Sequence, residues 1–125
     1  MRVLLDTHLV LWTLFDLDRI GGEAVPLLKR AETAIVISAV SFWEISIKRA
    51  TGKLVAPDDL PAIILSMGHE ILDVTPDHAW RAGALPRFHA DPFDRLLVAQ
   101  SQVERLPLVT HDRQLESYDV RIIRA

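Results

Sequence analysis

The alternation of short apolar runs with longer helical segments is the feature that most constrains this fold. Five runs are short, rich in Val, Ile and Leu, and bounded by polar or turn residues, which is typical of buried strands. The intervals between them carry helical periodicity or helix-capping residues. Strands that alternate with helices predict a parallel sheet with right-handed crossovers and helices on both faces. We therefore expect one three-layer α/β/α domain over residues 1–125. The predicted strands cover residues 2–5, 34–38, 70–74, 108–110 and 120–123.

Capping residues and prolines indicate where the helices begin. Thr75-Pro76 and Asp91-Pro92 each place a capping side chain before a proline at the first helical position. The second pair opens the strongest helical segment, which runs to Leu106 and is ended by Pro107. The other predicted helices cover residues 9–15, 23–31, 40–50, 57–68, 76–85 and, as a short one, 113–118.

Aromatic residues in these helices are predicted to lie in the core. In the helix over 40–50, Val40, Trp43 and Ile47 fall on one face at helical spacing, and that face is expected to pack against the sheet. Trp12 and Phe93 are assigned to the core as well, because tryptophan and phenylalanine in an apolar helix are more often core residues than platforms for bases.

Composition limits the classes of function. The chain has a net charge of −3 and no cysteine, so disulfides and thiolate metal sites are excluded. It has no signal-peptide pattern and no apolar run long enough to span a membrane, so we expect a cytoplasmic protein. The negative charge argues against broad electrostatic binding of nucleic acid. It does not exclude a nuclease, because bound divalent metal can offset a local cluster of carboxylates.

Four acidic residues are predicted to converge at one edge of the sheet. Asp6 and Asp112 follow strands, Asp94 lies in the first turn of a helix, and Glu44 lies about one turn into another. Ligands of open α/β sheets bind at the carboxyl ends of the strands. Converging carboxylates repel one another and raise each other's pKa unless cations lie between them. Oxygen ligands of this kind suit Mg²⁺ or Mn²⁺.

Each acid also has a simpler interpretation. Asp6 and Asp112 can be helix N-caps, and Asp94 can be an acid stabilised by the helix dipole. Glu44 can form a surface ion pair with Lys48 at spacing i, i+4. Only the joint position of the four favours a metal site.

Four blocks of the sequence resemble the signature blocks of PIN domains, and most closely those of VapC-type toxins from bacterial toxin–antitoxin pairs. They occur in the order expected for that family and extend over the whole chain. The blocks are Leu4-Leu5-Asp6-Thr7, Ser41-Phe42-Trp43-Glu44-Ile45, the segment from Asp91 to Gln100, and Leu108-Val109-Thr110-His111-Asp112.

The resemblance implies a function and a set of site residues. It implies an endoribonuclease that depends on Mg²⁺ or Mn²⁺, with Asp6, Glu44 and Asp94 as acidic catalytic residues and metal ligands and Asp112 in a supporting acidic position. It implies an RNA substrate and a cognate antitoxin as partners. Thr7, Thr110 and Arg95 are weaker candidates for the substrate rim, Asp91 is assigned as a helix cap, and His8 and His111 flank the acids.

Alternatives remain open at this point. A phosphoacceptor signalling domain also places acids at this edge of a five-stranded sheet, although it requires paired acids near the first strand, where Asp6 is alone. A catalytically silent binding module of the PIN fold is another. Helices 9–15 and 57–68 carry more apolar surface than one sheet covers, which predicts a homodimer or a bound antitoxin segment.

Overall fold

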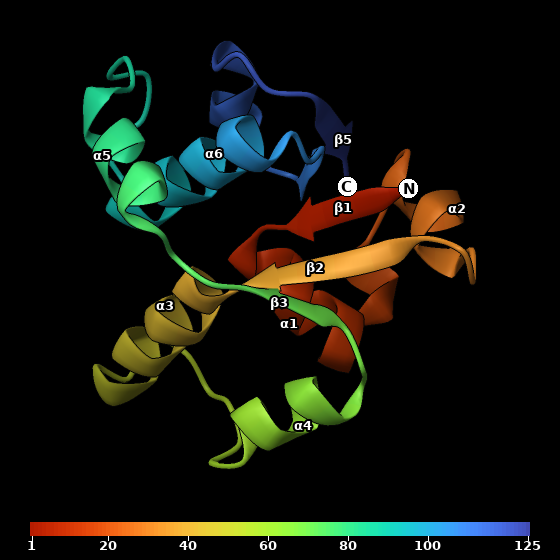
Figure 1. Cartoon of the computed structure of the whole chain (residues 1–125). Helices are drawn as coiled ribbons and strands as arrows, with labels where there is room; N and C mark the ends of the chain where they lie inside the picture. Colours follow the sequence, from red (N-terminus) through yellow and green to blue (C-terminus); the bar gives the residue numbers. More distant parts are fainter.

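The computed structural model describes all residues from Met1 to Ala125 and contains a sheet of five parallel strands (Figure 1). The strand order is β3-β2-β1-β4-β5, which confirms the predicted α/β class. The order reverses beside β1, so the carboxyl ends of β1 and β4 form the crevice where ligands of such sheets bind. The strands are β1 (Arg2–Leu5), β2 (Ala34–Ser38), β3 (Glu70–Leu72), β4 (Leu108–Thr110) and β5 (Ile122–Arg124).

The last strand begins later than the sequence predicts. β4 has only three residues, and they pair with Ile122, Ile123 and Arg124, so residues 120 and 121 lie outside the ladder. The predicted short helix before it is a 3₁₀ helix, η2 (Arg113–Ser117), and a second one, η1 (Leu17–Arg19), follows the first helix.

The α-helices lie close to their predicted positions. They are α1 (Thr7–Phe15), α2 (Ala24–Lys29), α3 (Ala39–Ala50), α4 (Leu60–Ser66), α5 (Pro76–Ala84) and α6 (Pro92–Glu104). None of these helices combines the length and the apolar content needed to cross a membrane.

The sheet separates two apolar cores. Successive residues of β1 point to opposite faces, so Val3 and Leu5 belong to one core and Leu4 to the other. The first core is completed by α1, α2, α4 and part of α3, and the second by α6 with residues around η2. This arrangement is the three-layer architecture that the alternation of strands and helices predicts.

The predicted core face of α3 is correct only at Val40, which is 2% exposed. Trp43 is 57% exposed and Ile47 is 36% exposed, whereas Ser41, Glu44 and Ile45 are buried. Helix α3 contacts both α1 and α6, and the Ser41 hydroxyl lies 3.0 Å from that of Thr7 on α1. Because α3 has apolar residues on two sides, its periodicity could not show which side faces its neighbours.

A buried polar network ties α5 and α6 to the ends of the strands. The fully buried Gln100 of α6 accepts a hydrogen bond from Ser38 at 2.5 Å and donates one to the carbonyl of Asp73 at 3.3 Å. His78 Nδ1 accepts the backbone N–H of Thr75 at 3.0 Å, so its Nε2 carries the proton and donates to Glu104 at 2.8 Å. Each group therefore has the partner that its burial requires.

We predict that Gln100→Leu lowers the free energy of unfolding by about 1–3 kcal/mol, because the buried Ser38 hydroxyl and Asp73 carbonyl lose their partner. Urea denaturation measures this change. Gln114→Leu is the matched control, since Gln114 is exposed and its side chain can be lost at little cost. Equal stabilities of the two variants would contradict the structural role of the network.

Candidate active site

Asp6 lies where β1 passes into α1 and is only 3% exposed. One carboxylate oxygen accepts the backbone N–H of Leu9 at 3.0 Å and caps α1, and the other accepts the hydroxyl of Thr110. Burial raises the pKa of Asp6, while the hydrogen bonds from Thr110 and Leu9 oppose the rise. Asp6 is therefore both the predicted cap and a buried acid at the crevice.

Asp94 is the acid whose ionisation is most strongly disfavoured. It lies in the first turn of α6, which Asp91 caps by accepting the backbone N–H groups of Phe93 and Asp94. Burial, together with the negative charges of Asp91, Glu44 and Asp6, raises the pKa of Asp94 to about 7. The mutual repulsion expected of converging acids is thus present at Asp94.

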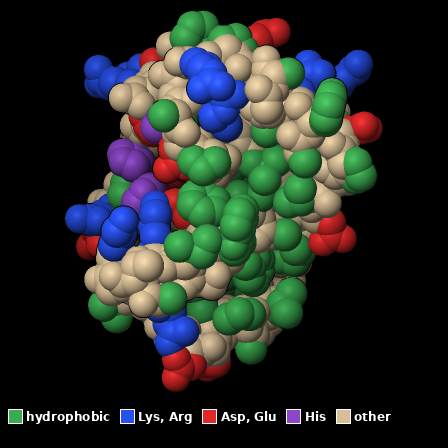
Figure 2. Space-filling view, turned by 90° about the vertical axis from the view of Figure 1, so that its left-hand side faces the viewer, with side chains coloured by type: hydrophobic (Ala, Val, Ile, Leu, Met, Phe, Trp, Pro, Cys, Tyr) green, Lys and Arg blue, Asp and Glu red, His purple; other side chains and the backbone are tan.

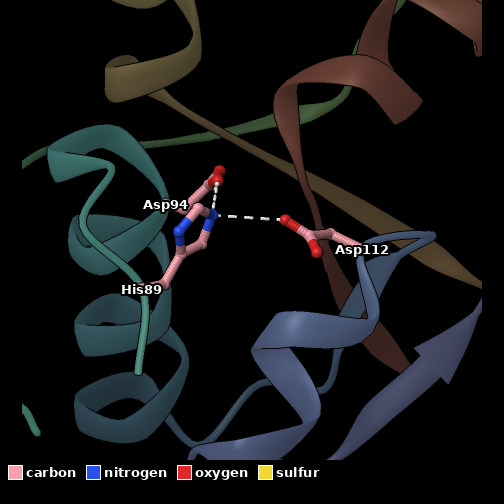
Figure 3. A group of neighbouring side chains, drawn as sticks. All are labelled: His89, Asp94 and Asp112. Carbon is pink, nitrogen blue, oxygen red and sulfur yellow. Dashed lines mark hydrogen bonds and ion pairs between the residues drawn. The ribbon is translucent and has the colours of Figure 1, made fainter. Parts of the chain in front are cut away.

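His89 joins two of the acids in a cluster that the sequence interpretation did not include (Figure 3). Its Nε2 lies 2.8 Å from Asp94 Oδ2 and 3.3 Å from Asp112 Oδ2. Each of the three residues offers one ligand atom, and these atoms lie within 4.8 Å of one another. His89 precedes the Asp91-Pro92 cap by two residues, and that short distance from the start of α6 was the one signal in the sequence for its position.

Glu44 is buried, and its negative charge raises the pKa of Asp94. It is 3% exposed, and one of its oxygens pairs with Lys48 Nζ at 2.5 Å. The ion pair predicted from the i, i+4 spacing is therefore present, but Glu44 is not on the surface as that interpretation requires. The other oxygen, Oε1, is buried and has no hydrogen-bond partner. A buried carboxylate oxygen without a partner is unfavourable, and a cation would satisfy it.

Thr7 and Thr110 have different surroundings. Both are buried, so neither lies on an open rim. Thr7 contacts Ser41, whereas the Thr110 hydroxyl donates to Asp6 and accepts the backbone N–H of Asp112 at 3.0 Å. Thr110 therefore fixes two of the acids relative to each other.

Arg95 holds the loop between α5 and α6. Its guanidinium donates to the carbonyls of Ala82 at 2.8 Å and of Leu85 and Pro86 at 3.0 Å. The Tyr118 hydroxyl donates to the same Pro86 carbonyl at 2.9 Å and accepts the backbone N–H of His89 at 3.0 Å. Arg95 and Tyr118 thus fix the loop that presents His89. A substrate contact by Arg95 would require it to give up these bonds.

Three of the four predicted acids line a single pocket, and Glu44 is not among the lining residues. None of the side chains that line the pocket is hydrophobic. They are Asp6, His8, Asp94, His111, Asp112 and Arg113. Glu44 acts on the pocket through its charge, which is felt at Asp94.

Comparisons with known proteins agree with this arrangement. The model of the PIN domain family matches residues 3–121. Among solved structures, VapBC2 from Rickettsia felis, bound to a DNA fragment from its promoter, gives a TM-score of 0.71 at 16% identity and covers 99% of this chain and 98% of that one. DNA-bound VapBC from Salmonella typhimurium gives a TM-score of 0.70 at 18% identity over 99% and 98% of the two chains.

A third similar structure is VapBC-5 from Mycobacterium tuberculosis, with a TM-score of 0.62, 21% identity and coverage of 99% and 98%. Comparison with curated protein sequences finds no significant match. The structural likenesses extend over the whole chain but have low identity, so they confirm the fold alone. The match of the family model to residues 3–121, together with a five-stranded parallel sheet that gathers acids at its carboxyl edge, identifies the chain as a member of the PIN domain family.

Proposed function

We propose that this chain is a metal-dependent endoribonuclease and the toxin of a type II toxin–antitoxin module. Buried carboxylates gather at one pocket, and this observation supports the proposal most directly. The pKa of Asp94 is raised to about 7, and Oε1 of Glu44 has no hydrogen-bond partner. Such a group of carboxylates is satisfied by a divalent cation. Membership of the PIN family favours this function over a phosphoacceptor signalling domain.

The residues fit an oxygen-binding divalent cation. Asp6, Asp94 and Asp112 would hold Mg²⁺ or Mn²⁺. Glu44 does not line the pocket but adds its negative charge to theirs. The imidazole of His89, beside Asp94 and Asp112, would favour Mn²⁺ if it entered the ligand set, because a nitrogen donor suits transition metals better than Mg²⁺. Bound metal would polarise a phosphoryl oxygen and lower the pKa of water at the pocket.

Neighbouring residues orient the acids of this pocket and neutralise part of their charge. The hydrogen bond from Thr110 keeps Asp6 in one orientation and favours its ionised form. Lys48 compensates one oxygen of Glu44 and leaves the other free. The loop held by Arg95 and Tyr118 sets His89 at hydrogen-bonding distance from Asp94, where an Nε2–H tautomer donates a hydrogen bond to the carboxylate.

We further propose that an antitoxin segment covers exposed apolar surface next to the site. Exposed hydrophobic side chains include Trp43 and Ile47 of α3, Leu65 of α4, and Met67 just after it. Figure 2 faces the side of the molecule that carries α3, α4 and α5 and shows hydrophobic side chains gathered there, with acidic and histidine side chains at their left margin. The similar solved structures are of toxin–antitoxin complexes, which supports a partner of this kind.

Asp94→Asn is expected to reduce RNA cleavage about a hundredfold or more, because it removes charge that holds the metal while leaving the fold intact. Cleavage of a labelled RNA in Mg²⁺ or Mn²⁺ measures the loss. Asp77→Asn is the matched control, since Asp77 also lies in the first turn of a helix but is exposed and outside the pocket. Wild-type activity of Asp94→Asn would exclude the assigned role and favour a catalytically silent module.

The free energy of unfolding of the metal-free protein is expected to fall as the pH rises from about 4 to about 7. Asp94 has a folded pKa of about 7 against an ordinary value of 3.8, so the folded chain holds an extra proton in this interval and loses that stabilisation as the pH rises. Asp94→Asn should flatten the dependence and raise the melting temperature of the metal-free protein at pH 8. Mg²⁺ or Mn²⁺ should raise the wild-type melting temperature there, by linkage.

Thermal melts with EDTA or with metal across this pH range test both expectations. Asp77→Asn again serves as the control and should follow the wild type. If metal leaves the melting temperature unchanged and Asp94→Asn only destabilises the protein, the acids are ordinary helix caps.

Trp43→Arg is expected to weaken association at the exposed apolar surface at least about tenfold, because it places a charge among hydrophobic side chains. Light scattering over a dilution series, with the chain alone and with the product of an adjacent antitoxin gene, measures homodimer and complex separately. A wild-type chain that binds no such product would contradict the proposed antitoxin. A wild-type chain that stays monomeric at every concentration would contradict the expected homodimer.

A further inference from the structure

Three aromatic rings gather beside the acidic pocket. His8 and Trp12 are on α1, and His111 follows β4. The ring centroids of Trp12 and His111 are 4.7 Å apart, those of His8 and His111 are 5.6 Å apart, and those of His8 and Trp12 are 6.1 Å apart. Segments a hundred residues apart in the chain therefore build one aromatic cluster.

The cluster is open to solvent on its imidazole side. His8 and His111 are exposed, and both line the pocket that contains Asp6, Asp94 and Asp112. Trp12 is half-buried and packs against the apolar core, which anchors the cluster. A purely structural role explains the position of Trp12, but it does not explain two exposed imidazoles in contact with it.

Two arginines flank the rings. Arg113 lines the same pocket, and the guanidinium carbon of Arg19 lies 5.6 Å from the centroid of the Trp12 ring. Both side chains are exposed. The Arg19 guanidinium also pairs with Asp16, at 3.3 Å between Nε and Oδ2. In a protein with a net charge of −3, Arg113 therefore supplies the local positive charge beside the carboxylates, where a phosphate of a nucleic acid must approach.

The three rings are inclined to one another, by 86° for His8 and His111 and by 50° for Trp12 and His111, so a flat base can stack on only one of them. We propose that His8, Trp12 and His111 form a binding site for an unpaired nucleobase of single-stranded RNA, in which the base stacks on the exposed ring of His111 and Arg113 contacts a flanking phosphate. This inference rests on the proposed ribonuclease function and adds to it the residues that contact a base of the substrate. Aromatic side chains bind single strands by stacking on exposed base faces. A paired base has both faces covered by its neighbours in the helix, so the site selects unpaired strands or loops.

The test uses the full chain with Asp94→Asn to prevent hydrolysis, and a fluorescein-labelled unstructured RNA of about ten nucleotides, in Mg²⁺. Fluorescence anisotropy gives the dissociation constant. His111→Ala should weaken binding about tenfold or more, the loss expected for one stacked base, and His8→Ala should act in the same direction. His111→Phe, which keeps a ring at this position, should restore most of the affinity.

Two comparisons separate stacking from other effects. An RNA of the same length with abasic residues should bind weakly and should be insensitive to His111→Ala, and a duplex should also bind weakly. Trp80→Ala is the control variant, because Trp80 is an 86% exposed aromatic on α5 that lines a different pocket. It should leave the dissociation constant unchanged.

The outcomes distinguish this inference from the proposed function. If the wild-type chain cleaves RNA but His111→Ala binds the base-containing RNA as tightly as its parent, the base-binding site is excluded and the nuclease stands. Equal sensitivity of abasic and base-containing RNA to His111→Ala excludes it as well. A chain that neither cleaves nor binds RNA overturns both.

Discussion

The buried hydrogen bond between Thr110 and Asp6 joins the two strands on which the site depends. Leu5 of β1 pairs with Val109 of β4, and this register places Asp6 opposite Thr110 at the carboxyl ends of the strands. Thr110 also accepts the backbone N–H of Asp112. The hydroxyl therefore sets the relative position of two acids that are more than a hundred residues apart. Parallel pairing across the point where the strand order reverses makes this contact possible.

The gathered acids are unfavourable for the metal-free fold. Burial and the neighbouring charges raise the pKa of Asp94, and burial raises that of Asp6. Lys48 and His89 compensate only part of this charge, since Glu44 keeps an oxygen without a partner. The apolar cores on both faces of the sheet provide the stability that tolerates this repulsion. Raised pKa values of this kind are typical of functional sites.

Helix capping and a role in the site are not alternatives for these acids. Asp6 uses one oxygen to cap α1 and the other to meet Thr110. Asp112 uses one oxygen to accept the N–H of Gln114 at the start of η2, and the other faces His89. A carboxylate has two oxygens, so the element that needs a cap also fixes the direction in which the free oxygen points. The capping interpretation of Asp6 and Asp112 is correct, and it leaves one oxygen of each acid available to the site.

The sequence alone determined the class of fold, the order of its elements and the edge at which the acids gather. These follow from local properties, since apolar runs, caps and prolines define the elements and parallel connectivity brings strand ends together. Only the tertiary structure decided which face of α3 is buried, because its apolar residues lie on two sides. The same holds for His89, whose loop has no periodicity and is positioned by bonds from Arg95 and Tyr118. The aromatic cluster of His8, Trp12 and His111 likewise required the pairing of β1 with β4, a contact between distant segments that no local pattern encodes.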